Sequence, residues 1–411
     1  MRKLLLILML PAFLTGCWDK VEIESRGFII SMGIDKYKDD GENDKENGDK
    51  KDGESDKENS AAQTDSKAGG QAPRYTVTIA LPDVGALMGT GQSEDVEFVR
   101  TASAPTVSEA IRQMGSFSGE RLYFGHTKAV IFGEELLKDE ELFREALDAL
   151  ERNRELSRNL LVLATADDVE KALITKGPGE NLAGMYLSKF YKNSDGAAVT
   201  FPLGLEALVR ELRSGRRGLP VAGAAGETII PLLSVEGEKK DAKVRLGGAA
   251  VIKDFTLAGK LDDSQTRALM WFRGTAEDAL LTVEYNEVSI PVRVNSNRAR
   301  TSFYEENGRI VCVLDIKGKA EVEEFVFAGV GLNNDETLRE LNETGGSVIA
   351  DEILRLFTVF RDELEVDGFG LRERLRKQNH LLYAAYGDDA YDAMTLVVRV
   401  DLEVNGAGMI K

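Results

Sequence analysis

The chain has 411 residues, of which 43% are hydrophobic, and its formal net charge is −18. A chain of this length can bury two or three cores. Polyanions repel so acidic a chain, which excludes nucleic acid as a partner. Its two cysteines are Cys17 and Cys312. If Cys17 is modified, a disulfide framework is excluded, and Cys312, which lies in an apolar run, is expected to be a small buried hydrophobe.

The first seventeen residues are typical of an exported lipoprotein. Arg2 and Lys3 precede an apolar run at residues 4–14, which is too short to span a bilayer but suits the core of a signal peptide. The Leu-Thr-Gly-Cys that ends at Cys17 has the form of a lipobox. We therefore predict a signal peptide at residues 1–16, cleavage between Gly16 and Cys17, and S-diacylglycerol on Cys17, with N-acylation (palmitate) as a further modification. The alternative is an uncleaved signal and an ordinary cysteine.

The predicted lipid determines how the chain would be held at a membrane. Loss of Arg2 and Lys3 with the signal changes the net charge to −18 − 2 = −20, so anionic headgroups would repel the chain as a whole. Two acyl chains anchor a protein stably, because each buried methylene contributes roughly 0.8 kcal/mol. No later segment of the sequence is long and apolar enough to cross a bilayer. We expect a lipid-anchored protein on the extracytoplasmic face.

Residues 17–212 are predicted to form an N-terminal α/β domain. Two predicted strands, at residues 27–35 and 75–81, enclose an acidic insertion at residues 38–73. The insertion contains eleven Asp or Glu, six Lys and no side chain more apolar than Ala, so we predict that it is disordered. Its Asp and Gly spacing does not fit a calcium-binding EF-hand loop.

Helices and strands alternate in the rest of this domain. Apolar spacing predicts helices at residues 106–114, 134–153, 167–175, 182–191 and 202–212, and strands at 126–132 and 158–164. Residues 213–242 are interpreted as a connecting region or as part of a middle domain.

Residues 243–411 are predicted to form a C-terminal α+β domain. Predicted hairpins pair 244–253 with 255–261, 280–285 with 288–295, and 299–305 with 309–316, and a further strand covers 322–327. Asp262 is a predicted N-cap for a helix at 265–272, a long helix carries an apolar stripe from residue 338 to 360, and a last strand covers 395–404. The fold class is therefore α+β, multi-domain, with mixed and largely antiparallel sheets, packed helices and two to three domains.

A series of short motifs resembles the Ger(x)C lipoproteins, the C subunits of nutrient germinant receptors in bacterial spores. They are Cys17-Trp-Asp, Glu22-Ile-Glu, Gly33-Ile-Asp, Tyr123-Phe-Gly-His-Thr-Lys, Phe132-Gly-Glu-Glu-Leu, Gly247-Gly-Ala-Ala-Val-Ile-Lys, Gly259-Lys-Leu-Asp, Thr266-Arg-Ala-Leu-Met-Trp-Phe-Arg and Asp367-Gly-Phe-Gly. The resemblance covers nearly the whole mature chain, although the family usually lacks the acidic insertion. It implies a multi-domain α+β protein without known enzymatic activity. It also implies integral membrane A and B subunits as partners, at the outer face of the inner spore membrane.

No catalytic or metal-binding pattern emerges from the sequence. His126 and His380 lack the partners of a zinc site, and we expect His126 to be structural. Phe117 occupies the position where a nucleophile elbow needs serine. We therefore expect no enzyme activity, no cofactor and no metal.

Two aromatic motifs have two open interpretations. Trp271, between Met270 and Phe272, fits either a core face or an exposed contact with a partner, since Trp and Arg are enriched at interface hot spots. Arg267 and Arg273 flank it. Phe369 fits either a plug in the last domain or a side chain presented to a partner.

The leading functional hypothesis is a membrane-anchored lipoprotein subunit of a spore germinant receptor, needed for nutrient-triggered germination through contacts with integral membrane subunits. The alternative is a lipid-anchored extracytoplasmic solute-binding protein. The alternative predicts two similar α/β lobes with parallel sheets and a cleft at their hinge.

Overall fold

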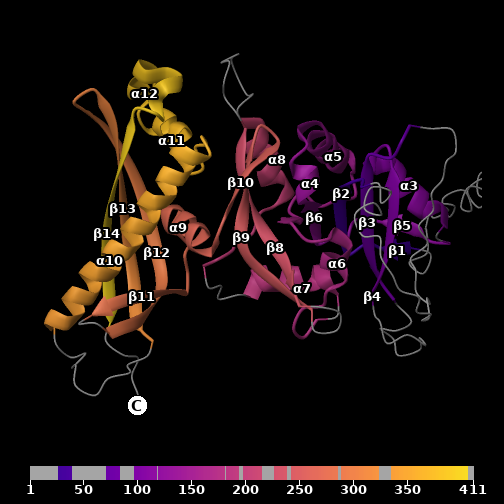
Figure 1. Cartoon of the computed structure of the whole chain (residues 1–411), viewed down its shortest axis with the longest axis horizontal. Helices are drawn as coiled ribbons and strands as arrows, with labels where there is room; N and C mark the ends of the chain where they lie inside the picture. The colour runs from indigo at the N-terminus through magenta and orange to yellow at the C-terminus, as the bar shows by residue number, and fades with distance from the viewer. Residues whose placement is uncertain are drawn as a thin grey trace, which may run out of the picture.

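A computed structural model describes residues 26–38, 71–83, 97–117, 119–180, 182–193, 198–214, 226–237, 242–285, 288–323 and 335–405. The predicted signal peptide, its cleavage site and Cys17 lie outside the described residues. So does most of the acidic insertion, and so do residues 324–327 of the strand predicted at 322–327. The described part is multi-domain with mixed sheets and packed helices, as the sequence predicts (Figure 1).

The first large sheet has eight strands in the order β10-β9-β8-β7-β6-β2-β3-β4. Neighbours β2, β6, β7 and β8 are parallel, and the remaining pairs are antiparallel. The strands are β2 (Ser31–Lys36), β3 (Tyr75–Pro82), β4 (Glu97–Ala104), β6 (Ala129–Gly133), β7 (Leu161–Thr165), β8 (Glu227–Glu236), β9 (Lys243–Lys253) and β10 (Thr256–Leu261). The sequence predicts a C-terminal domain that begins at residue 243. The sheet instead continues through β9 and β10, because both pair with strands of this sheet.

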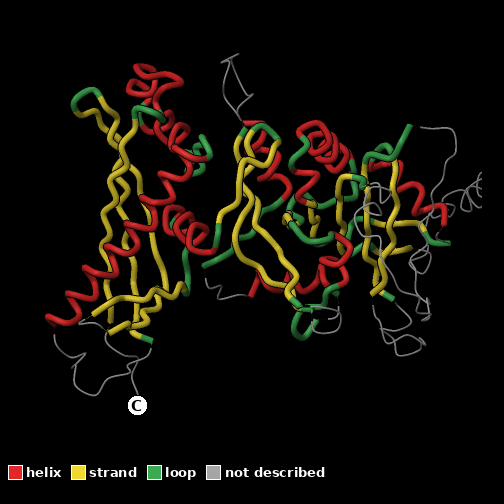
Figure 2. The backbone as a smooth tube through the Cα atoms, viewed as in Figure 1, coloured by secondary structure: helices red, strands yellow, loops and turns green. Residues whose placement is uncertain are grey.

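Helices cover both faces of the parallel part, as a sheet without a solvated face requires. On β6, Val130 and Phe132 lie in one core, whereas Ala129 and Ile131 lie in another, which is the two-residue period of a strand. The first core takes in α3 (Val107–Phe117), α4 (Glu134–Leu137), α5 (Glu140–Arg152) and α8 (Leu205–Ser214). The second takes in α6 (Val169–Ile174) and α7 (Ala183–Asn193). Helices therefore pack on both sides of the parallel strands (Figure 2).

The single helix predicted at residues 134–153 is wrong: two helices, α4 and α5, replace it. Lys138 closes α4, and its backbone N–H donates to the carbonyl of Glu134. Asp139 then adopts an extended conformation, and its side chain accepts a hydrogen bond from the backbone of Leu142 at 3.2 Å. The amphipathic period continues across the break, but an Asp favours the N-cap over a helix interior.

A small parallel sheet joins the start of the described chain to the loop before β6. It pairs β1 (Arg26–Phe28) with β5 (Arg121–Tyr123). From β1 the chain continues through Ile29 and Ile30 directly into β2, so this small sheet lies against the large one. The backbone N–H of Ile30 donates to the carbonyl of Ala80 in β3.

The second large sheet has the order β11-β12-β13-β14. Its strands are β11 (Ala279–Tyr285), β12 (Val288–Glu306), β13 (Arg309–Val322) and β14 (Met394–Asn405). Asn307 and Gly308 form the predicted turn between β12 and β13, and both have positive φ (51° and 72°), as a type I′ hairpin requires. Two strands predicted at 288–295 and 299–305 are in fact one, β12, with a register shift between Val294 and Ser296. Strand β14 is parallel to β13, because the crossover between them contains α10 (Asp335–Thr358).

Helix α10 covers the inner face of this second sheet, and α9 (Asp263–Arg273) lies between the two large sheets (Figure 1). Asp262 caps α9 as predicted, and Gln265 completes a capping box. One continuous core contains Ile229 and Val251 of the first sheet together with α9, α10 and the second sheet. Cys312 faces this core and is fully buried, which confirms its predicted role. After α10 come a π-helical turn (Val359–Glu363), α11 (Leu371–Gln378) and α12 (His380–Tyr386).

Glu97 on β4 connects this strand to the start of α7. Its Oε2 accepts a hydrogen bond from the backbone N–H of Ala183 at 3.1 Å, and burial raises the pKa of this carboxyl from 4.5 to about 7. The folded state therefore holds this proton more tightly than the unfolded state does. The resulting stabilisation is complete below about pH 4.5 and is lost as the pH rises towards 7.

We expect Glu97→Gln to remove this pH dependence while it keeps the acceptor for Ala183. The free energy of unfolding of the variant should exceed that of the wild type by about 2 kcal/mol at pH 8 and by much less at pH 5. Urea unfolding at the two pH values measures the difference, and the exposed Glu321→Gln is the control. An equal difference at both pH values would contradict the prediction.

Candidate functional site

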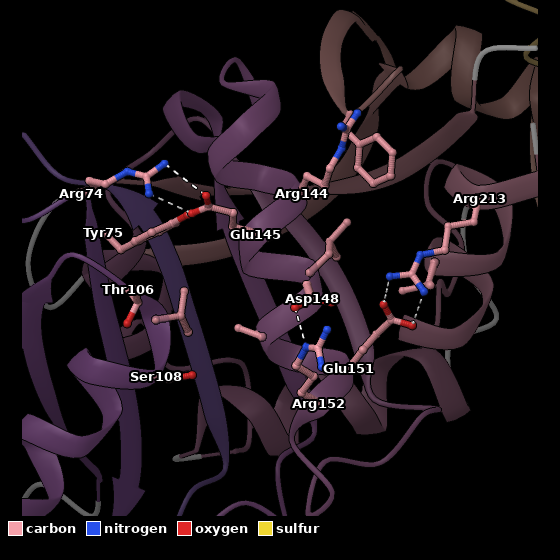
Figure 3. A pocket seen from close by; sticks show the side chains of 15 residues that line it. Arg74, Tyr75, Thr106, Ser108, Arg144, Glu145, Asp148, Glu151, Arg152 and Arg213 are labelled. Atoms are coloured by element: carbon pink, nitrogen blue, oxygen red, sulfur yellow. Dashed lines mark hydrogen bonds and ion pairs between the residues drawn. The ribbon is translucent and has the colours of Figure 1, made fainter. Parts of the chain in front are cut away.

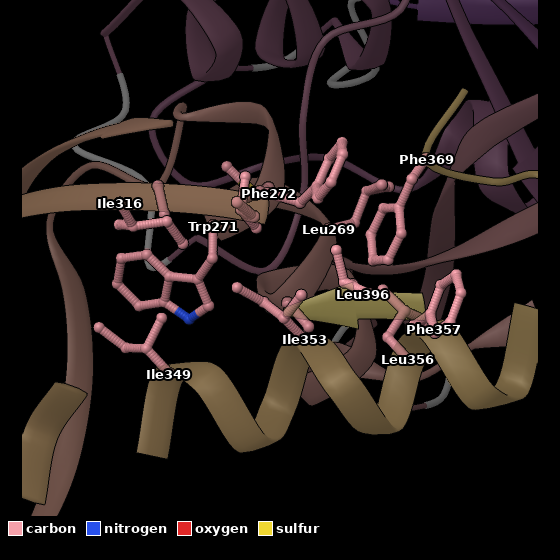
Figure 4. Close-up of a cluster of buried hydrophobic side chains, with 14 of the residues drawn as sticks. Leu269, Trp271, Phe272, Ile316, Ile349, Ile353, Leu356, Phe357, Phe369 and Leu396 are labelled. Atoms are coloured by element: carbon pink, nitrogen blue, oxygen red, sulfur yellow. The ribbon is translucent and has the colours of Figure 1, made fainter. Parts of the chain in front are cut away.

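The predicted contact residue Trp271 lies inside the C-terminal core (Figure 4). It has 0% exposure, and its indole N–H donates to Oε2 of Glu352 at 3.1 Å. Ile349 and Ile353 of α10 pack around the ring (Figure 4). The interpretation as a partner contact is therefore wrong for Trp271, because α10 covers the face of α9 that carries it.

Phe369 is also a core residue, with 4% exposure. Its ring stacks on that of Phe272 with centroids 4.1 Å apart, and it meets Phe360 edge to face at 5.1 Å. The next residue, Gly370, has a φ of +66°, which favours glycine. The motif at residues 367–370 thus makes a tight turn that inserts Phe369 into the core, so the contact interpretation is wrong for Phe369 as well.

The two arginines that flank Trp271 have different surroundings. The guanidinium of Arg267 pairs with Glu352, with Nε 3.2 Å from Oε2, and this pairing raises the pKa of Arg267. Glu352 is 6% exposed, so Arg267 neutralises a buried carboxylate that also receives the Trp271 N–H. Arg273 is exposed on its helix, and its guanidinium lies 4.8 Å from the centre of the Phe201 ring. Of the four predicted contact residues, Trp271 and Phe369 are buried, Arg267 is partly exposed and Arg273 is exposed.

A buried polar cluster joins the first sheet to the C-terminal unit. It consists of Glu227 on β8, Asp367 in the turn before α11, and Arg372 on α11. The backbone N–H of Asp367 donates to Oε2 of Glu227 at 2.7 Å, and Arg372 donates to Oε1 of Glu227 at 2.9 Å. Asp367 in turn accepts from the backbone N–H groups of Leu371 and Arg372, both at 2.7 Å. We call these three residues the interdomain cluster.

Burial makes the ionised forms of the two carboxyl groups in the interdomain cluster less favourable, which raises their pKa. Burial is the largest cause of the raised pKa of Asp367, which reaches about 7, and the nearby Glu227 raises it further. Burial also raises the pKa of Glu227, although Arg372 opposes the shift. The sequence analysis singled out the motif at residues 367–370 but not Glu227 or Arg372. Because Glu227 and Asp367 lie 140 residues apart, no local pattern connects them.

A cleft of about 830 Å³ lies on the first unit, along α5 (Figure 3). Its walls include the start of α3, the end of α8 and Phe255, which follows β9. Arginines and carboxylates alternate around it, but they pair with one another. Arg74 pairs with Glu145 at 3.0 Å, Arg152 pairs with Asp148 at 2.6 Å, and Arg213 pairs with Glu151.

The chemistry of this cleft is that of a solvated polar surface. Thr106, at its edge, caps α3 by accepting from the backbone N–H of Glu109, and neither histidine lines the cleft. The cleft also does not lie between two similar lobes, because one unit is built on a mixed eight-stranded sheet and the other on a four-stranded sheet. The architecture therefore differs from the one that the solute-binding alternative predicts.

The two histidines lie in separate units, His126 in the turn before β6 and His380 at the start of α12. Within the described ranges, no group of three or more His, Cys, Asp or Glu side chains is arranged to hold a metal ion. Within the same part of the chain, no helix is long and apolar enough to cross a membrane.

Comparison with protein-family profiles gives two matches that follow one another along the chain. The "Spore germination protein N-terminal domain" matches residues 19–224, and "Spore germination B3/GerAC like, C-terminal" matches residues 247–408. Together they cover most of the sequence, so the chain belongs to the GerAC family of spore germination proteins.

Individual relatives agree with this assignment. The chain is 22% identical over 387 residues to YfkR of Bacillus subtilis (strain 168), covering 90% of this chain and 87% of YfkR. It is 22% identical over 421 residues to the spore germination protein YndF of the same organism, covering 99% and 97%. The crystal structure of the GerBC protein superimposes with a TM-score of 0.54 at 16% identity, over 83% of this chain and 99% of that chain. This match shows a shared fold.

We expect Arg267→Ala to destabilise the protein by about 3 kcal/mol, because it leaves the buried carboxylate of Glu352 without its counter-charge. Arg152→Ala is a matched control. Arg152 is 78% exposed, and an exposed pair contributes at most about 1 kcal/mol. Chemical denaturation followed by tryptophan fluorescence measures both. Equal losses in the two variants would contradict the assigned role of Arg267.

We expect Asp367→Ala to loosen α11, because the variant loses both acceptors for the first backbone N–H groups of that helix. Loss of a helix N-terminal acceptor costs about 1–2 kcal/mol. Amide hydrogen exchange in residues 371–378 should accelerate roughly tenfold, whereas exchange in α5 should stay unchanged. The exposed Asp389→Ala is the control, and unchanged exchange at α11 in Asp367→Ala would refute the role of Asp367.

Proposed function

We propose that the protein is a lipid-anchored subunit of a spore germinant receptor. It acts without catalysis, through contacts with integral membrane A and B subunits at the extracytoplasmic face of the membrane. The observation that carries the proposal is the order of features along one chain: a lipobox ending at Cys17, then the two spore germination domains at residues 19–224 and 247–408.

The internal arrangement supports a role in binding rather than in catalysis. The two most buried carboxylates among the described residues, Asp367 and Glu352, hold helices and units together. The charged side chains around the cleft on α5 are paired with each other. What remains for function is the outer surface of the body built on the two large sheets, which is where contacts with membrane subunits would be made.

The anchor is tested directly by Cys17→Ala. Because a chain without the lipid has no stable hold on the membrane, we expect spores of this variant to respond to nutrients as slowly as spores that lack the protein. Loss of optical density after addition of single nutrients measures the response in the wild type, the deletion and Cys17→Ala. The control is Cys312→Ala, which removes the buried thiol and should germinate like the wild type.

A response that is normal in all these strains for every nutrient would contradict the receptor role. A deletion that loses the response to one nutrient class while Cys17→Ala keeps it would contradict the need for the anchor alone.

A further inference from the structure

The small sheet β1/β5 has an outer face whose residues do not belong to any core described in the structure. Register pairs Arg26 with Arg121 and Phe28 with Tyr123, so the alternation of a strand puts these four side chains on one face. On the opposite face, Gly27 is buried and Leu122 packs against the first core. The outer face together with His126 is called the aromatic–arginine face.

The rings of this face pack on one another. Phe28 meets Tyr123 edge to face with centroids 5.8 Å apart, and it meets His126 in the same way at 5.0 Å. The guanidinium of Arg26 lies 5.0 Å from the centre of the Tyr123 ring. None of these rings is a member of the three hydrophobic cores. Phe28 and Tyr123 are half-buried, whereas His126 and Arg121 beside them are exposed, so one edge of the ring cluster reaches the surface.

The local backbone presents this face outwards. Thr127 is buried, and its hydroxyl donates to the carbonyl of Ile29 at 3.3 Å, while Phe124 points into the first core. Between them the turn displays His126, which is exposed. A Cβ at Gly125 would lie 2.4 Å from the Tyr123 hydroxyl, so this position needs glycine for the ring to keep its place. In the motif at residues 123–128, Gly125 therefore leaves room for the Tyr123 ring, and the same turn exposes His126 next to that ring.

The charges favour an anionic occupant. Arg26 and Arg121 are direct register partners, and like charges opposite each other destabilise a sheet. A phosphate between them would remove that repulsion. Two carboxylates lie near the small sheet. Oε2 of Glu120 lies 2.9 Å from where a Cβ at Gly27 would be, on the opposite face, and Glu155 accepts from the backbone N–H of Phe124. The chain as a whole has a net charge of −18, whereas this face carries two neighbouring positive charges.

The position of the face in the chain indicates which anion it meets. Arg26 follows Cys17 by 26 − 17 = 9 residues. Nine residues span at most about 30 Å even when fully extended, so a lipid on Cys17 would keep this face close to the bilayer. Aromatic rings beside arginines are the composition found at headgroup level.

We propose that the aromatic–arginine face binds the membrane surface through anionic phospholipid headgroups and so orients the anchored protein. The inference rests on the proposed lipid anchor. It places β1 and β5 at the membrane and the opposite end of the molecule, with β13, β14 and α12, far along the long axis (Figure 1).

A fluorophore at two positions tests the orientation. His126→Cys and Leu381→Cys are labelled with bimane in the full-length lipidated protein, in vesicles of phosphatidylcholine and phosphatidylglycerol that carry a nitroxide on the headgroup. Leu381 is 84% exposed on α12, at the other end of the chain's fold. Cys312 does not compete for the label, because it is fully buried and burial raises the pKa of its thiol to about 12.

We expect at least threefold stronger quenching at position 126 than at position 381. The difference should decline when phosphatidylglycerol is omitted, when salt is raised, or when Arg121→Glu is added. Equal quenching at the two positions would overturn the proposal. So would a weak signal at 126 in vesicles combined with crosslinking of that position to an integral membrane subunit, since the face would then bind protein.

Mass spectrometry of the same sample separates this inference from the proposed function. If diacylglycerol is found on Cys17 and position 126 is not quenched preferentially, only the orientation is wrong. If Cys17 carries no lipid, the anchor itself fails.

Discussion

The burial of α9 between the two large sheets is the interaction on which the rest of the structure depends. The helix starts immediately after β10, at a capping box formed by Asp262 and Gln265. Its far end inserts Trp271 and Phe272 into a core shared by both sheets. Burial of such a ring contributes about 2–3 kcal/mol, and α10 packs both on α9 and directly on β14. The polar groups at this junction, Glu352 with Arg267 and Trp271, are satisfied by one another.

The second constraint is the interdomain cluster, which connects β8 to α11. Its carboxylates are buried against the preference of charged groups for water, as the raised pKa of Asp367 records. The hydrogen bonds of the cluster connect β8 to α11, and the apolar core around α9 packs against both large sheets.

Much of the fold could be predicted from local patterns. The strands at 126–132 and 158–164, the helix cap at Asp262 and the turn at Asn307 and Gly308 appear in the structure within a few residues. Errors arose where a capping residue interrupts an amphipathic period, as at Asp139. They also arose where a long strand continues past a bulge, as in β12. The predicted contact residues Trp271 and Phe369 were placed on helices and turns correctly, but the neighbour that covers each of them comes from α10 or α9, far away in sequence.

The sequence by itself determined the acidity of the chain, the order of most secondary-structure elements and the resemblance to a family, and it predicted the lipobox at Cys17. Each of these depends on residues that are adjacent or periodically spaced. Only the tertiary structure decided that β9 and β10 belong to the first sheet, that Glu227 meets Asp367 across 140 residues, and that Arg26 and Arg121 lie side by side. Those pairings depend on how strands align in a sheet. Their free energy comes from contacts among residues that no local pattern relates.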